Sequence, residues 1–241
     1  MNVRNKTILI TGANRGIGRA IEEALKRGAK RVYAGSRQPF VHSDDRVTPL
    51  ILDVTNAAQI KGAVDSVAVL DILVNNAGVD LHDDLSERAG IDRHLAVNLF
   101  GTHGVTQAFL PLLARSQGAI VNVLSLGTLA SVPFSPAYAI SKAAAFSMTQ
   151  ALRALWAGPG VKVHSVFPGP VDTDLTRNLD IPKASAESVA RAIVDGIEKE
   201  EEDIFPDPMS GNIADGWRSG VTKALERQFA AYTPENVAKS S

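Results

Sequence analysis

Short apolar runs alternate with amphipathic stretches along most of the chain. Six runs are mainly apolar and are followed by small or polar residues; they cover residues 8–10, 32–35, 47–52, 71–74, 119–124 and 161–167. Strands buried on both faces have this pattern, which is typical of a parallel sheet covered by helices. With a short seventh strand at residues 204–205, the pattern predicts an α/β fold: a doubly wound, mostly parallel seven-stranded sheet with helices on both faces, Rossmann-like.

The segments between these runs have helical spacing. We expect a helix just after Gly18, a long helix over about residues 92–117, an alanine-rich helix ending near residue 156, and another helix beginning near residue 185. Residues 38–46 are polar and short, so any helix there is abbreviated or missing. Trp217, Val221, Ala224 and Leu225 predict an amphipathic terminal helix that packs on the domain or on a neighbour, and we expect core packing.

Composition narrows the class of protein. A length of 241 residues fits one domain over 1–241, and 45% apolar with 5% aromatic residues suits a buried parallel sheet. A net charge of −1 does not indicate a basic surface that would bind nucleic acid or an anionic membrane. No run approaches the ~18 apolar residues of a membrane span, so we expect a cytoplasmic protein. The absence of cysteine excludes disulfides, thiolate metal sites and cysteine nucleophiles.

Three glycines follow the first apolar run. Gly12, Gly16 and Gly18 lie between the predicted strand and helix, with Asn14, Arg15 and Ile17 among them. Glycine lets the backbone approach a ligand closely, and the start of a helix offers free N–H groups to an anion. The segment therefore indicates a nucleotide phosphate site, and the alternative is a tight turn without a ligand.

The end of the second strand bears on which cofactor is bound. Dinucleotide-binding folds that prefer NAD carry an acid here, whereas an arginine accommodates the 2′-phosphate of NADP. Ser36 and Arg37 replace the acid, and Arg15 can approach the same phosphate. The pattern favours NADP, with two solvated arginines as the alternative. Asp53 follows the third strand and either accepts a hydrogen bond from adenine or caps the next helix.

Polar or turn residues also end the other strands. Gly12, Ser36, Asp53, Asn75, Ser125 and Pro168 each stand at a carboxyl end. Ligands of doubly wound sheets bind beyond these ends, so the residues converge on one crevice. Asp80, Asp83 and Asp84 crowd a loop with His82, which we interpret as a solvated loop; we expect no metal.

Tyr138 and Lys142 carry the candidate chemistry. A spacing of four places them side by side on one helical face. A nearby ammonium stabilises the phenolate and lowers the pKa of the phenol from ~10. Ser125 can polarise a substrate carbonyl while Tyr138 protonates it. The alternative is an exposed helix pair.

The whole set resembles the short-chain dehydrogenase/reductase family in its compact single-domain form. The resemblance covers about residues 6–173 and rests on residues 11–18 (TGANRGIG), Asp53, residues 75–78 (NNAG), Asn98, Ser125, Tyr138 with Lys142, and Pro168-Gly169 with Thr173. It implies hydride exchange between nicotinamide and a carbonyl or alcohol carbon. It also implies that Lys142 holds the nicotinamide ribose, that Asn98 fixes a water linking Lys142 to solvent, and that Thr173 with the Val171 backbone holds the carboxamide.

The expected site residues follow from these two lines of reasoning. The catalytic candidates are Asn98, Ser125, Tyr138 and Lys142. The cofactor-binding candidates are Gly12, Asn14, Arg15, Gly16, Ile17, Gly18, Ser36, Arg37, Asp53, Val54, Asn75, Ala77, Gly78, Tyr138, Lys142, Pro168, Gly169, Val171 and Thr173.

The function expected from the sequence is NADP-dependent carbonyl reduction or, in reverse, alcohol oxidation on a small molecule. A non-catalytic NADP-binding sensor is the alternative, although a sensor has no need of Ser125, Tyr138 and Lys142 together. A methyltransferase would favour an acid at Ser36. The resemblance further implies a homo-oligomer, a dimer or tetramer, with dimerisation through the helices bearing Asn98 and Tyr138.

Overall fold

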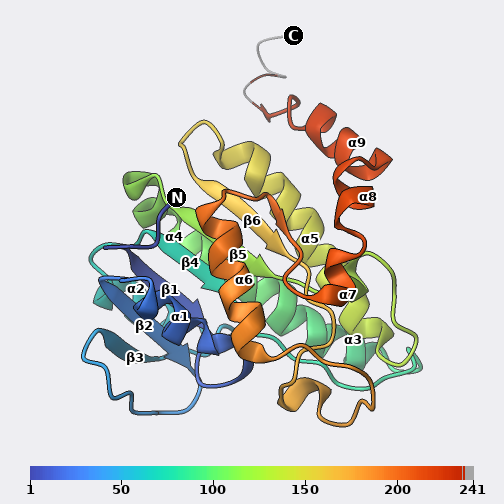
Figure 1. The fold of residues 1–241 in the computed structure, drawn as a ribbon, viewed down its shortest axis with the longest axis horizontal. Helices are drawn as coiled ribbons and strands as arrows, with labels where there is room; N and C mark the ends of the chain where they lie inside the picture. The colour runs from blue at the N-terminus through green and yellow to red at the C-terminus, as the bar shows by residue number, and fades with distance from the viewer. Residues whose placement is uncertain (235, 237–241) are drawn as a thin grey trace.

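Seven parallel strands form one sheet through the middle of the molecule (Figure 1). The computed structural model describes residues 1–234 and 236, without the side chains of residues 19, 21 and 22. The strands are β1 (Thr7–Thr11), β2 (Arg31–Ser36), β3 (Val47–Ile51), β4 (Ile72–Asn75), β5 (Ala119–Val123), β6 (Lys162–Val166) and β7 (Asp203–Ile204). Their order is β3-β2-β1-β4-β5-β6-β7. The predicted Rossmann-like fold is confirmed, with strand ends within one or two residues of those expected.

Helices cover both faces of the sheet because side chains alternate along each strand. On one face, Ile8 and Ile10 of β1 join a core with α1 (Ala20–Lys26) and α6 (Ala186–Glu198). On the other face, Leu9 joins a core with α2 (Ala57–Ser66), α4 (Thr102–Ser116) and α5 (Pro136–Trp156). A short 3-10 turn, η1 (Gly16–Arg19), precedes α1.

The predicted long helix over residues 92–117 is divided into three parts. It comprises α3 (Arg88–Leu95), a π-helical segment η2 (Ala96–Gly101), and α4. Asn98 lies in the π-helical segment, and Gly101 lies so close to Val54 that a β-carbon on it would be 2.6 Å from Val54 Cγ2. A π-helical turn inserts one extra residue into the hydrogen-bonded turn of an α-helix. Its position depends on tertiary contacts such as that between Gly101 and Val54, so the helical spacing of apolar residues does not predict it.

The C-terminal segment differs more from the prediction made from the sequence. After α7 (Pro208–Gly211) the chain forms two short helices, α8 (Ala214–Arg218) and α9 (Val221–Phe229), which lie at the edge of the molecule (Figure 1). Trp217 packs on the core as expected, with its ring centroid 5.7 Å from that of Phe146. Val221 is 77% exposed and Leu225 42%. The expectation of one core-packed helix is therefore wrong for α9.

None of the helices in the described part of the chain combines the length and apolar character needed to cross a bilayer. Two 3-10 turns, η3 (Leu126–Thr128) and η4 (Asp174–Thr176), complete the elements near the carboxyl ends of the strands. No helix forms between β2 and β3, as the polar segment there predicts.

Candidate active site

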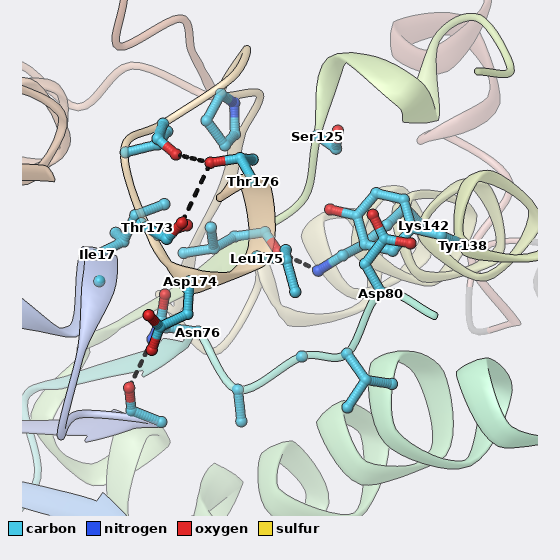
Figure 2. A pocket seen from close by; sticks show the side chains of 18 of the residues that line it. Ile17, Asn76, Asp80, Ser125, Tyr138, Lys142, Thr173, Asp174, Leu175 and Thr176 are labelled. Atoms are coloured by element: carbon cyan, nitrogen blue, oxygen red, sulfur yellow. Dashed lines mark hydrogen bonds between the residues drawn. The ribbon is translucent and has the colours of Figure 1, made fainter. Parts of the chain in front are cut away.

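A cavity of about 640 Å³ opens at the carboxyl ends of the strands. It is lined by the predicted residues Gly12, Asn14, Arg15, Gly16, Ile17, Ser36, Arg37, Asp53, Val54, Ala77, Gly78, Ser125, Tyr138, Lys142, Pro168, Gly169, Val171 and Thr173. Figure 2 shows Ser125, Tyr138, Lys142 and Asp80 on one side of it and Ile17, Thr173 and Asp174 on the other. Gly18, Asn75 and Asn98 do not line the cavity.

The glycine turn forms the floor. Gly12 has a φ of +64° and lies so close to the next loop that a β-carbon on it would be 2.9 Å from Ala77 Cα. Gly18 serves packing within the turn, because a β-carbon there would be 2.6 Å from the Gly12 carbonyl oxygen. The glycine turn can keep this conformation, and leave its backbone accessible to a flat ligand, because Gly12 and Gly18 have no side chains.

The two asparagines after β4 have different surroundings. Asn75 is buried beneath the cavity, and its Nδ2 donates to Thr106 Oγ1 and Asn122 Oδ1, both at 2.9 Å, so it links β4 to α4 and β5. Asn76 lines the cavity and donates to the carbonyls of Thr11 and Gly12 at 3.1 and 3.0 Å. Asn76 is not among the predicted cofactor-binding residues, although it holds the glycine turn in place.

The predicted ribose corner brings Ser36, Arg37 and Asp53 together. The buried Ser36 hydroxyl donates to the Gln38 carbonyl at 2.9 Å, whereas Arg37 is exposed. Burial raises the pKa of Asp53, but hydrogen bonds from Thr55 and the positive charge of Arg37 outweigh it, so the pKa lies below its usual value. Asn56, not Asp53, caps α2.

Arg15 already has a partner on the opposite wall. Its guanidinium pairs with Asp174 at 3.0 Å, which joins the glycine turn to η4. Arg177 pairs with the same carboxylate. The Arg15 side chain is 60% exposed. An anionic ligand at the turn would compete with Asp174 for this guanidinium.

Tyr138 lies in the first turn of α5, on the same side of the cavity as Ser125 (Figure 2). Burial raises the pKa of Tyr138 to about 12; a hydrogen bond with Ser125 opposes the rise and the negative charge of Asp80 adds to it. The expected lowering by Lys142 is therefore wrong for this structure: desolvation of the phenolate exceeds any effect of the ammonium. A phenol that remains protonated at neutral pH is suited to donate a proton.

Lys142 is buried one helical turn from Tyr138. Its Nζ donates to the Val123 carbonyl at 2.8 Å and lies 5.7 Å from the Tyr138 ring centroid. Burial lowers the pKa of Lys142 to about 8, partly offset by the negative charge of Asp80. Gly78 leaves room here, because a β-carbon on it would be 3.5 Å from Nζ.

Asn98 lies behind this group and fixes the cavity wall. Its Oδ1 accepts from the Val79 N–H and its Nδ2 donates to the Val79 carbonyl, both at 2.9 Å. The same Nδ2 donates to Ser141 Oγ on α5 at 2.9 Å. Asn98 therefore holds the chain after β4 against the helix that carries Tyr138.

The sequence predicts pocket walls over residues 80–86, 126–136 and 175–182, and it misses lining residues that lie outside these stretches. Asp80 is the first residue of the predicted wall 80–86, and it lines the cavity. Met209 of α7 reaches the cavity from far along the sequence, and no local signal marks it. The remaining wall is apolar and includes Val132, Phe134, Leu175, Leu179 and Ile181. Leu129, an expected wall residue, packs into the core around Phe146 instead.

Comparisons with known proteins agree with this arrangement. Residues 6–184 match a family model described as short chain dehydrogenase. The solved structure of a short chain dehydrogenase from Burkholderia cenocepacia in complex with NADP is 33% identical, with a TM-score of 0.86, and covers 97% of this chain and 100% of that one. An uncharacterized oxidoreductase of Staphylococcus epidermidis is 35% identical over 208 residues, 80% of this chain and 90% of that protein.

A mammalian relative is longer. Estradiol 17-beta-dehydrogenase 2 of Mus musculus is 35% identical over 196 residues, which is 74% of this chain and 51% of that protein. The chain thus spans about half the length of this relative.

Proposed function

Because the chain belongs to the short-chain dehydrogenase family, we propose that it is an NADP-dependent oxidoreductase that transfers a hydride between nicotinamide and a carbonyl or secondary alcohol carbon. The observation that carries the proposal is the convergence of Ser125, Tyr138 and Lys142 on one end of a cavity whose floor is the glycine turn. A nucleotide-binding floor and a proton donor in one cavity are what carbonyl reduction requires.

The cavity fits a dinucleotide. The glycine turn, which Asn76 holds in place, presents backbone without side chains to the pyrophosphate. Asp53 lies where it can bind the adenine, and Val171 and Thr173 lie where they can bind the carboxamide. The bound cofactor supplies the hydride. Ser36 and Arg37 stand where NAD-preferring folds carry an acidic residue, which favours binding of the 2′-phosphate of NADP. The Burkholderia relative was solved in complex with NADP.

This chain supplies the proton and positions the substrate. Tyr138 gives its hydroxyl proton to the carbonyl oxygen, and Ser125 donates a hydrogen bond to the same oxygen. The Lys142 ammonium steadies the phenolate left behind. Asn98 acts as a positioning residue, because it fixes Val79 and Ser141 around this group.

The apolar wall indicates the rest of the substrate. Val132, Phe134, Leu175, Leu179 and Ile181 offer burial to an apolar group attached to the carbonyl. The substrate class proposed is therefore a ketone or aldehyde with an apolar substituent.

The protein is also proposed to dimerise through α5. Its exposed face carries a row of apolar or small residues at helical spacing: Ile140, Ala143, Ser147, Ala151 and Leu155. Such rows mark interfaces in soluble proteins.

The test is NADPH oxidation with a panel of aldehydes and ketones by wild type and Tyr138→Phe. We expect Tyr138→Phe to bind NADPH, measured by fluorescence, and to lose about 100-fold or more in kcat. Tyr232→Phe, at a 66% exposed tyrosine, is the matched control. Wild type that bound NADPH yet turned over no carbonyl or alcohol would instead indicate a sensor.

A further inference from the structure

One carboxylate stands at the substrate end of the cavity, beside the apolar wall and the reacting residues. The Asp80 side chain is 14% exposed, and it lines the cavity with Tyr138 and Lys142 (Figure 2). Its Oδ1 accepts a hydrogen bond from the buried Ser135 hydroxyl. Within the described residues this is the one hydrogen bond that the carboxylate accepts, which leaves Oδ2 available to a ligand. A carboxylate oxygen that lines a cavity can accept a hydrogen bond from a donor group of a ligand.

His94, which lies close to Asp80, does not neutralise this carboxylate. His94 Nε2 lies 4.0 Å from Asp80 Oδ1, but it accepts the Leu81 N–H at 2.9 Å. His94 Nδ1 lies 2.8 Å from the Gly90 carbonyl and must carry the proton to donate to it. These partners assign a neutral imidazole, so His94 supplies neither a charge nor a proton to Asp80.

Ser135 fixes where Asp80 lies relative to the proton donor. Ser135 is the N-cap of α5 and Tyr138 is three residues further on. Tyr138 lies in the first turn of the same helix, so the Ser135 contact brings Asp80 to the helix end that carries Tyr138. Asp80 is therefore held one turn from Tyr138, and its charge acts on both reacting groups: it adds to the rise in the Tyr138 pKa and opposes the fall in the Lys142 pKa, which burial dominates.

We infer that Asp80 is a specificity-determining residue that binds a hydroxyl or ammonium donor close to the reacting carbonyl of the substrate. The inference rests on the proposed function, since it names the substrate class of the same cavity. It predicts an apolar ketone that also carries a donor, and it predicts exclusion of keto acids, whose carboxylate would face that of Asp80. A site built to bind a substrate hydroxyl discriminates strongly against the analogue without it.

The test uses matched phenyl ketones. Initial rates of NADPH oxidation are measured with acetophenone, α-hydroxyacetophenone, propiophenone, β-hydroxypropiophenone and the keto acid phenylglyoxylate. For wild type we expect kcat/KM to be about tenfold or more higher for at least one hydroxyketone than for its parent ketone, mainly through KM. Phenylglyoxylate should be the poorest substrate.

The informative variant is Asp80→Asn, which keeps the shape and an acceptor for Ser135 but removes the charge. We expect the ratio of kcat/KM between hydroxyketone and parent ketone to fall about tenfold and phenylglyoxylate to improve. Asp84→Asn makes the same charge change in the same loop, at an exposed residue outside the cavity, and should preserve the wild-type ratios. Thermal melting and NADPH affinity show whether each variant is folded and loaded.

The outcomes separate the two proposals. If wild type oxidises NADPH with none of the ketones, the proposed function is contradicted. If wild type reduces them but shows no preference for either hydroxyketone, or if Asp80→Asn lowers all rates by the same factor, the specificity role of Asp80 is overturned. A uniform loss would mean that Asp80 acts only through Tyr138 and Lys142.

Discussion

At Tyr138, desolvation governs the proton that the proposed reaction uses. The structure raises the pKa of the phenol to about 12 and lowers that of Lys142 to about 8. Both shifts keep the pair nearer to neutral than either group would be in water, as expected of buried ionisable groups. The site is thus poised to give a proton rather than to take one, which corresponds to carbonyl reduction.

The lowered pKa of Lys142 predicts a pH dependence of stability. The native state releases this proton near pH 8 and the unfolded chain near pH 10.5, so the unfolded state binds more protons between these values and stability rises with pH across that window. Compared with Lys142→Met, wild type should gain up to ~1.4 kcal/mol per pH unit there. Urea unfolding from pH 7 to 10 checks this.

Lys30→Met, at an exposed lysine, is the control and should follow the wild-type pH profile. Tyr138 acts in the opposite direction above pH 10, where the native state keeps a proton that the unfolded chain has lost. A stability difference between wild type and Lys142→Met that stays constant with pH would contradict the account.

Asp174 is expected to weaken cofactor binding. Its carboxylate holds Arg15, the residue proposed to meet the 2′-phosphate. Asp174→Asn should therefore tighten NADPH binding by about two- to fivefold, the range of an exposed ion pair, and leave NADH nearly unchanged. Fluorescence titration measures both dissociation constants. Asp180→Asn, an exposed acid outside the cavity, should change neither; equal tightening for both cofactors would exclude a role at the 2′-phosphate.

The sequence predicted most of the candidate lining residues correctly, because polar residues at strand ends and glycines in turns can be recognised from the local sequence. The three candidates that do not line it, Gly18, Asn75 and Asn98, instead support residues that do. Sequence alone does not distinguish a residue that lines the cavity from one that supports the lining, since either role requires the same residue type at the same position. Asp80 was expected in the cavity wall, but no sequence signal marked its hydrogen bond with Ser135, a contact across 55 residues.

At the scale of elements, the helices that support the site depend on polar contacts as well as apolar ones. The apolar periodicity predicted α5 and α6 because each buries a continuous apolar face. It did not predict the π-helical turn at Asn98 or the break before α9. Gly220 caps α9, and ion pairs attach this helix to the sheet, so its apolar residues are left exposed.

Lys223 is the residue on which this attachment depends most. It is buried, and its Nζ pairs with Asp203 at 2.8 Å and with Glu226 at 3.0 Å. Arg153 pairs with both carboxylates from α5. Lys223→Met should cost about 3–5 kcal/mol, because it leaves buried carboxylates short of a cation. Urea unfolding measures the loss.

The control for Lys223 is Lys199→Met, at an exposed lysine. Burial raises the pKa of Asp203, but Arg153 and Lys223 outweigh it and hold the pKa below its usual value. The stabilisation from Asp203 is therefore present at neutral pH and lost as pH falls below about 4, and the Lys223→Met loss should shrink in acid. A loss independent of acid would point to packing instead.

At the scale of the molecule, the proposed dimer predicts a simple change of mass. Leu155→Lys places a charge in the exposed row of α5 and should convert dimers to monomers in sedimentation velocity, because an unpaired charge is costly at an interface. Val69→Lys, at a 58% exposed apolar residue outside this row, should remain dimeric. A wild-type protein that sediments as a monomer would contradict the proposal.

The most direct test of the central claim follows the hydride itself. Wild type is given a reducible ketone and NADPH carrying deuterium at the transferred position of the nicotinamide, and the product alcohol is examined by mass spectrometry. We predict one deuterium on the former carbonyl carbon, and a product yield reduced about 100-fold or more with NADPH-loaded Tyr138→Phe. An unlabelled alcohol, or labelled product formed by Tyr138→Phe at the wild-type rate, would contradict the account.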